Sequence, residues 1–208
     1  MGVLLYGGSF DPFHNGHYHM LRLFSDLTEI HTILLMPSYQ TPKKERSSVP
    51  AKERLMALRA VSTSFPNRKK NPVSFIISDY EIMKKGVSWT IQTLVWLKET
   101  YPDQPLYLGL GSDTFFSLHK WRAYKDILAM VTVIVVRRDQ LPLKAYVAYI
   151  EQEFPSRKDA VKILDNTVIP VSSTDIRRQI GCSDAWRSGV PDSIRDRIDH
   201  ENWKVYYQ

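Results

Sequence analysis

Residues 3–17 of the chain read VLLYGGSFDPFHNGH, in which an apolar run leads into a loop rich in glycine, proline and histidine. The apolar residues 3–6 are typical of a short buried strand. Gly7 and Gly8 allow the backbone to turn or to approach a ligand closely, and Asp11-Pro12 turns the chain again. The stretch therefore predicts the first strand and loop of an α/β fold, with a helix after the loop.

Short apolar runs of this kind recur along the chain and alternate with segments of helical periodicity. Ile91, Leu94 and Val95, for example, recur at helical intervals. Strands that are nearly continuously apolar and alternate with helices indicate a parallel sheet covered on both faces. We therefore expect an α/β fold with a doubly wound parallel sheet, in a single domain over residues 1–208. The expected strands are 3–6, 32–36, 73–77, 106–110, 131–136 and 167–171.

The composition limits the classes of protein that the sequence fits. With 208 residues, 43% of them hydrophobic, the chain suits one sizeable core. Its single cysteine, Cys182, excludes an internal disulfide and a four-cysteine zinc site. The sequence shows no signal peptide and no apolar run near the roughly 20 residues that span a bilayer. We expect a cytoplasmic protein with no membrane partner.

The net charge of +6 favours an anionic partner. Lysine and arginine fall in short clusters scattered along the chain, not in one long stripe with aromatic residues between them. Such scatter suits a phosphorylated small molecule better than nucleic acid, although each cluster alone is also compatible with a solvated surface.

His14 and His17 lie three residues apart, so both face the same side of the helix that should start here. The free N–H groups of a helix N-terminus stabilise anions, and imidazole groups add further donors. Two alternatives stay open at this point. The histidines could be ordinary surface residues beside a turn, or, together with His19, they could bind a metal ion, although further ligands are then needed.

The eleven residues GGSFDPFHNGH resemble the signature of the HxGH nucleotidyltransferases, Rossmann-like enzymes that transfer a nucleoside monophosphate from a nucleoside triphosphate. Residues 171–177, VSSTDIR, are similar to the second motif of that superfamily, SSTxIR. Between the two, TPKK at 41–44, SWT at 88–90 and GSD at 111–113 follow the order found in bacterial nicotinate-nucleotide adenylyltransferases, as do Lys120-Trp121 and Arg137-Arg138. The resemblance implies a Rossmann-like fold, with a helical segment at about 172–208 packed on it.

The resemblance also implies the residues that handle phosphate. His14, His17, Lys44 and Arg177 would be catalytic, because they supply donors and positive charge to the reacting phosphates. The residues implied in ATP binding come from both motifs and from two loops between them: Gly7, Gly8, Ser9, Phe10, Gly16, Gly111, Asp113, Arg137, Ser172, Ser173 and Thr174. By itself, the serine and threonine run is more typical of helix capping, and Arg177 at the spacing of the second motif reverses that preference. No metal ligand is expected among the side chains, since Mg²⁺ would be held mainly by the phosphates of ATP.

The second substrate is implied by the remaining motifs. Trp121 resembles a tryptophan that stacks on the pyridine ring, and Ser88, Trp89 and Thr90 resemble a segment that receives the nicotinate carboxylate, with Lys43 nearby. A core role is the alternative for either tryptophan. The chain departs from many relatives by having Lys43 in place of histidine and Trp89 in place of tyrosine.

The implied reaction joins the AMP moiety of ATP to nicotinate mononucleotide and yields deamido-NAD and pyrophosphate, a step of NAD biosynthesis. The alternatives are a nicotinamide-mononucleotide or phosphopantetheine adenylyltransferase, or a catalytically silent nucleotide sensor. A homodimer stays open.

Overall fold

The computed structural model describes residues 1–42, 46–66 and 72–207. Its six strands form one all-parallel sheet in the order β3-β2-β1-β4-β5-β6. The strands are β1 (Gly2–Gly8), β2 (Ile30–Pro37), β3 (Ser74–Ile77), β4 (Leu106–Gly111), β5 (Thr132–Val136) and β6 (Val161–Leu164). The expected doubly wound, Rossmann-like α/β fold in a single domain is therefore confirmed.

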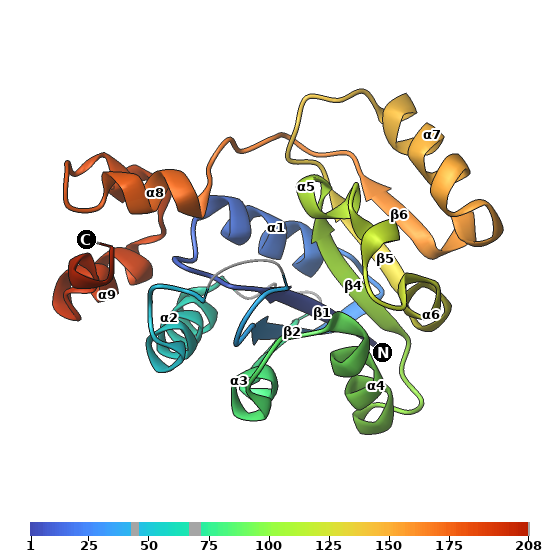
Figure 1. The fold of residues 1–208 in the computed structure, drawn as a ribbon, viewed down its shortest axis with the longest axis horizontal. Coiled ribbons are helices and arrows are strands. Elements are labelled where there is room, and N and C mark those ends of the chain that lie inside the picture. The colour runs from blue at the N-terminus through green and yellow to red at the C-terminus, as the bar shows by residue number, and fades with distance from the viewer. Residues whose placement is uncertain (43–45, 67–71, 208) are drawn as a thin grey trace.

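Helices cover both faces of the sheet (Figure 1). The α-helices are α1 (Asn15–Ser25), α2 (Ala51–Ser64), α3 (Tyr80–Lys84), α4 (Thr90–Thr100), α5 (Ser112–Phe115), α6 (Tyr124–Met130), α7 (Leu143–Glu153), α8 (Ser173–Gln179) and α9 (Asp192–His200). Short 3-10 helices lie at Leu118–Lys120, Pro155–Ala160, Ala185–Gly189 and Trp203–Tyr206.

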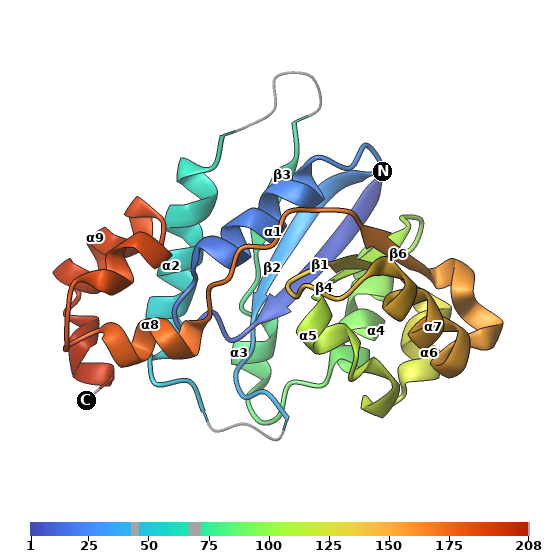
Figure 2. The ribbon, with the colours of Figure 1, turned by 90° about the horizontal axis from the view of Figure 1, so that it is seen from above.

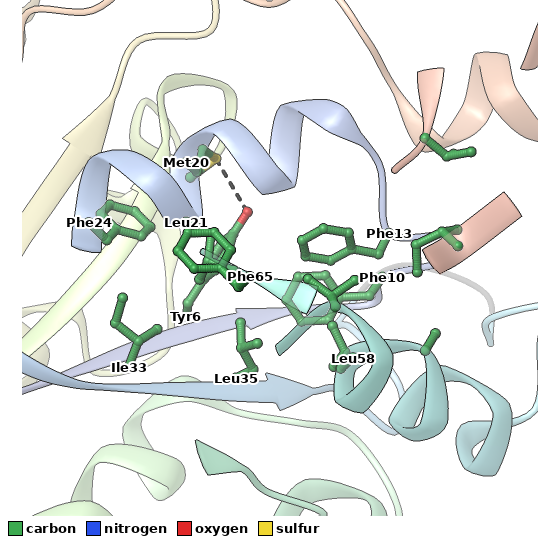
Figure 3. Close-up of a cluster of buried hydrophobic side chains, with 14 of the residues drawn as sticks. Tyr6, Phe10, Phe13, Met20, Leu21, Phe24, Ile33, Leu35, Leu58 and Phe65 are labelled. Atoms are coloured by element: carbon green, nitrogen blue, oxygen red, sulfur yellow. Dashed lines mark hydrogen bonds between the residues drawn. The ribbon is translucent and has the colours of Figure 1, made fainter. Parts of the chain in front are cut away.

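Alternate residues of each central strand enter two different hydrophobic clusters. Leu4 and Tyr6 of β1 belong to the cluster that α1, α2, α8 and α9 build (Figure 3). Val3 and Leu5 of the same strand belong to the cluster that α4, α6 and α7 build. Because side chains on a strand alternate between its faces, a strand buried on both sides needs the continuous apolar run that the sequence contains.

One expected strand is wrong. Residues 167–171 form no strand, and the sixth strand is β6, which pairs with β5 from Val133↔Val161 to Val136↔Leu164. Asn166 ends this pairing, because its side chain accepts a hydrogen bond from Arg137 N and donates one to Arg137 O, both at 2.9 Å. Pro170, which has no N–H to donate, is also poorly suited to a strand ladder.

Residues 173–206 pack against α2 and join the hydrophobic cluster that contains Leu4 and Tyr6. They lie at the opposite end of the molecule from α6 and α7 (Figure 2). Trp186 and Trp203 are fully buried there, as are Ile194 and Ile198 of α9. The guanidinium of Arg197 also lies 2.9 Å from the Glu53 carboxylate on α2. This packing brings the start of α8 to the loop that follows β1.

The strand order reverses between β1 and β4, the neighbours at the centre of the sheet. In open α/β sheets, ligands bind at the carboxyl ends of the strands beside such a switch point. The loop after β1 (residues 9–14) and Gly111, the last residue of β4, lie at these ends. The fold therefore places the GGSFDPFHNGH stretch where a ligand is expected.

Candidate active site

His14 and His17 cap the start of α1 reciprocally. His17 N donates to His14 Nδ1 at 3.3 Å, and His14 N donates to His17 Nδ1 at 3.2 Å. The two rings stack with centroids 3.7 Å apart and planes at 21°. The expected placement of both imidazoles at a helix N-terminus is therefore what the structure contains, with His14 as the N-cap residue.

This cap fixes the tautomer of both rings. Because each Nδ1 accepts a backbone N–H, the proton of each neutral imidazole must sit on Nε2. Neither Nε2 has a hydrogen-bond partner in the part of the chain that the structure describes. Burial, with the charge of Arg138 acting in the same direction, lowers the pKa of His14 to about 3 and that of His17 well below its usual value. The site thus presents two neutral N–H donors that are free to bind an anion.

Gly16 and Gly111 are needed because side chains occupy the space where a Cβ would lie. A Cβ on Gly16 would lie 2.9 Å from His14 Cε1, so any larger residue would push the imidazole away. A Cβ on Gly111 would lie 2.5 Å from Asp113 Oδ1 and 2.6 Å from Arg138 Cδ. Both glycines therefore allow functional side chains to pack directly over the backbone.

Several contacts hold the loop after β1 in place, and one of them comes from a buried arginine of α2. Arg54 of α2 is 2% exposed, and its Nη1 donates to Ser9 O at 2.8 Å and to Ser38 O at 2.9 Å. Phe10 adopts a left-handed conformation with φ of 49° and buries its ring beside His17, with ring centroids 5.2 Å apart. Gly8 O accepts a hydrogen bond from Ser38 N, which ties the end of β1 to the end of β2.

The second motif lies directly against this loop. Ser172 caps α8, since its hydroxyl accepts from Asp175 N at 3.1 Å. Ser173 Oγ donates to Pro12 O at 3.0 Å, and Arg177 donates to Asp11 O and to the hydroxyl of Thr174. The two motifs therefore meet, although Ser173 and Arg177 here contact the protein backbone.

Asp113 and Arg138 form an ion pair beside the histidines. Arg138 Nη1 lies 3.2 Å from Asp113 Oδ2, and Arg138 Nη2 donates to Val171 O at 3.1 Å. The side chain of Arg137 does not join this group, since it binds Asp165 at 3.0 Å and Leu141 O at 2.9 Å. The two arginines follow β5 directly and bond to opposite neighbours, since Arg137 N donates to Asn166 Oδ1 whereas Arg138 N donates to Ser112 Oγ.

The residues expected to bind the pyridine nucleotide also come together. Ser88 lies beside the end of β2, because its N donates to Gln40 O at 2.8 Å and its Oγ accepts from Tyr39 N at 3.1 Å. Trp89 is the N-cap of α4, and the guanidinium of Arg122 lies 5.4 Å from the centre of its ring. Arg122 follows Trp121 directly, so the two tryptophan segments are neighbours.

The first N–H groups of a helix have no partner within it, and at the start of α4 they belong to Thr90 and Ile91. Within the part of the chain that the structure describes, neither of these two N–H groups has a hydrogen-bond partner. The N–H of Ser88, by contrast, is already bound to Gln40. The predicted residues Lys43 and Lys44 lie outside the described residues.

Sequence reasoning missed Arg54 and the role of Arg138. A signal existed for Arg54, because it occupies the apolar face of α2 at helical spacing from Ala57, Leu58 and Val61, all buried. For Arg138 the sequence offered only an adjacent pair of arginines.

Comparison with known proteins agrees with this geometry. The Cytidylyltransferase-like family model matches residues 5–179. The chain belongs to this family. It is therefore a nucleotidyltransferase, as the two motifs predicted.

Relatives that are similar in sequence to the chain include two named "Probable nicotinate-nucleotide adenylyltransferase". The one from Aquifex aeolicus is 36% identical over 174 residues, which are 83% of this chain and 99% of the relative. The one from Leptospira interrogans is 31% identical over 198 residues, 93% of this chain and 90% of the relative. The predicted resemblance to nicotinate-nucleotide adenylyltransferases is confirmed.

Solved structures share the fold of this Cytidylyltransferase-like chain. Plasmodium falciparum nicotinic acid mononucleotide adenylyltransferase complexed with NaAD matches with a TM-score of 0.80 at 19% identity, over 99% of this chain and 98% of that one. The same protein complexed with APC matches with a TM-score of 0.78 at 18% identity, over the same shares of the two chains. Among the described residues, no helix is both long and apolar enough to cross a membrane.

Proposed function

We propose that the protein is an adenylyltransferase that joins the AMP moiety of ATP to nicotinate mononucleotide and releases pyrophosphate. The observation that carries this proposal is the pair of free Nε2–H donors of His14 and His17 at the switch point of the sheet. Similar chains with the corresponding name support the choice of substrates.

The reaction needs little from the protein beyond positioning and charge stabilisation. A phosphate oxygen of nicotinate mononucleotide attacks the α-phosphorus of ATP, and the bond from that phosphorus to the bridging oxygen of pyrophosphate breaks. The attacking phosphate has a second pKa near ~6, so it is largely dianionic at neutral pH and no general base is required. Negative charge then grows on the pyrophosphate.

His14 and His17 act as preorganised donors for that growing charge. Their reciprocal cap holds both rings in place before the substrate binds, so the donors need no reorganisation during the reaction. The guanidinium of Arg177 and the start of α8 would add positive potential across the loop.

Mg²⁺ would enter with ATP, and it would neutralise the charge of the phosphate oxygens. Among the described residues, no three His, Cys, Asp or Glu side chains converge as metal ligands. We therefore propose that the phosphates of ATP and water bind the ion. Asp113, whose side chain is 59% exposed, is the carboxylate we propose for a ribose hydroxyl.

The acceptor would bind between the two tryptophan segments. We propose that Trp121 stacks on the pyridine ring, while the free N–H groups at the start of α4 receive the nicotinate carboxylate. An amide in place of the carboxylate carries no charge to be stabilised by these donors, which favours nicotinate mononucleotide over nicotinamide mononucleotide.

The proposal is tested by measuring pyrophosphate release from ATP and Mg²⁺ with nicotinate mononucleotide, nicotinamide mononucleotide or phosphopantetheine as the acceptor. We expect the highest kcat/KM with nicotinate mononucleotide, and a kcat that is lower by on the order of 10² in His17→Ala. A preference for either other acceptor would assign the protein a different substrate. Absence of release with all three would refute the proposed reaction.

A further inference from the structure

The carboxylate of Asp11 connects three segments that are far apart in the sequence. It lies inside the loop after β1 and is only 4% exposed. Its Oδ2 accepts a hydrogen bond from Ser48 N at 2.7 Å, and its Oδ1 accepts one from the hydroxyl of Tyr207 at 2.9 Å. Both oxygens of this buried carboxylate therefore accept hydrogen bonds. The carboxylate holds Ser48 N and the Tyr207 hydroxyl in place, because releasing either donor leaves a buried charge incompletely paired.

Tyr207 is well placed to hold this carboxylate. Its ring packs against the hydrophobic cluster of α1, α2, α8 and α9, so the position of its hydroxyl follows from the packing. Burial and the negative charge of Asp11 raise the pKa of Tyr207, so the hydroxyl keeps its proton and remains a donor. Nothing in the local sequence links the two residues, which are 196 positions apart.

The segment that Asp11 holds leads directly to the histidines. The backbone carbonyl of Asp11 accepts from Arg177, and that of Pro12 accepts from Ser173. Two residues after Pro12, His14 caps α1. Any shift of the loop therefore moves the N-cap, and with it the reciprocal bonds that orient both imidazoles.

We propose that Tyr207 is a positioning residue of the phosphate site, which acts through Asp11 to hold the loop at residues 9–13 and thereby the two imidazoles. The inference rests on the proposed function for its catalytic consequence. A small displacement of a positioned donor costs far more rate than stability. The hydroxyl of Tyr207 is therefore assigned to the reaction geometry as well as to the fold.

Tyr207→Phe removes this hydroxyl alone, and Tyr206→Phe is the matched control. Tyr206 is the adjacent residue, is also partly buried against the same cluster, and its hydroxyl makes no hydrogen bond among the described residues. We expect Tyr207→Phe to lower kcat by about fivefold or more, with KM for nicotinate mononucleotide unchanged. The control should keep the kcat of the wild type.

Amide hydrogen exchange provides a readout that does not depend on the reaction. In Tyr207→Phe the amides of Ser48, His14 and His17 should exchange roughly tenfold faster, while amides in β4 and β5 stay protected. In Tyr206→Phe none of these should change. A wild-type protein that fails to use nicotinate mononucleotide would refute the proposed function, and the exchange data would still decide the positioning of the imidazoles.

Asp11→Ala tests the same link from its other end and does not depend on the folding of Tyr207→Phe. Alanine removes both acceptor oxygens, so the hydroxyl of Tyr207 and Ser48 N lose their partner, and kcat should fall at least as far as in Tyr207→Phe. If both single variants fold, we expect the double variant Asp11→Ala/Tyr207→Phe to lose no more kcat than Asp11→Ala alone. Additive losses, or a Tyr207→Phe protein with the exchange pattern and kcat of Tyr206→Phe, would overturn the proposal.

Discussion

Lowering the pH should destabilise the folded protein through His14. Its pKa is 6.5 in an unfolded chain and about 3 in the folded protein, where burial and Arg138 disfavour the imidazolium. Between these values the unfolded state holds a proton on His14 that the folded state does not. Because stability rises with pH wherever the unfolded state binds more protons, the free energy of unfolding must fall as the pH is lowered from 6.5 towards 3.

The size of the effect follows from the pKa values. A pH of 5 lies 1.5 units below the pKa of 6.5 that His14 has in the unfolded chain, so the unfolded imidazole is almost fully protonated there. At about 1.4 kcal/mol per unit, His14 alone should remove about 2 kcal/mol of stability between pH 7 and pH 5. His17, whose pKa is also lowered, acts in the same direction.

Urea unfolding of the wild type and of His14→Asn at pH 7 and pH 5 measures this contribution. Asparagine is a good N-cap residue, so the variant can retain the start of α1 without a titrating group. We expect the wild type to lose about 2 kcal/mol more than His14→Asn over this range. Equal pH dependence in the wild type and His14→Asn would refute the buried, neutral His14 on which the donor assignment depends.

Three further predictions concern the phosphate site. His17→Ala should lower kcat for pyrophosphate release by on the order of 10², as loss of a preorganised donor does, while the circular dichroism spectrum stays that of the wild type. Gly16→Ala should lower kcat by at least about tenfold, because its Cβ would lie 2.9 Å from His14 Cε1, and the imidazole ¹⁵N shifts of His14 should change with it. Arg138→Gln should raise KM for ATP several-fold more than Arg137→Gln does, since only Arg138 pairs with Asp113; equal effects of the two substitutions would contradict this assignment.

The sequence predicted the local parts of this protein well. The apolar runs predicted the parallel sheet, and the placement of His14 and His17 at a helix start agrees with the reciprocal cap. These features depend on neighbouring residues, where spacing and residue type carry the information. The sixth strand was misplaced because 161–164 and 167–171 are both short apolar runs, and the choice depends on how the side chain of Asn166 binds Arg137.

Features that depend on side-chain direction or on long-range contacts could not be predicted from the sequence pattern. Whether Arg137 or Arg138 pairs with Asp113 depends on how the chain leaves β5, which two adjacent identical residues cannot reveal. The link from Tyr207 to Asp11 joins residues 196 positions apart and depends on the packing of α9 on α2.

The central claim is that the AMP moiety of ATP is transferred to the phosphate of nicotinate mononucleotide. Incubating the protein with Mg²⁺, nicotinate mononucleotide and ATP labelled with ³²P at either the α- or the γ-phosphate tests it most directly. The account predicts that the α label appears in a dinucleotide with the mass of deamido-NAD and that the γ label appears only in pyrophosphate. Label from the γ position in the acceptor, or α label only in free AMP, would contradict it.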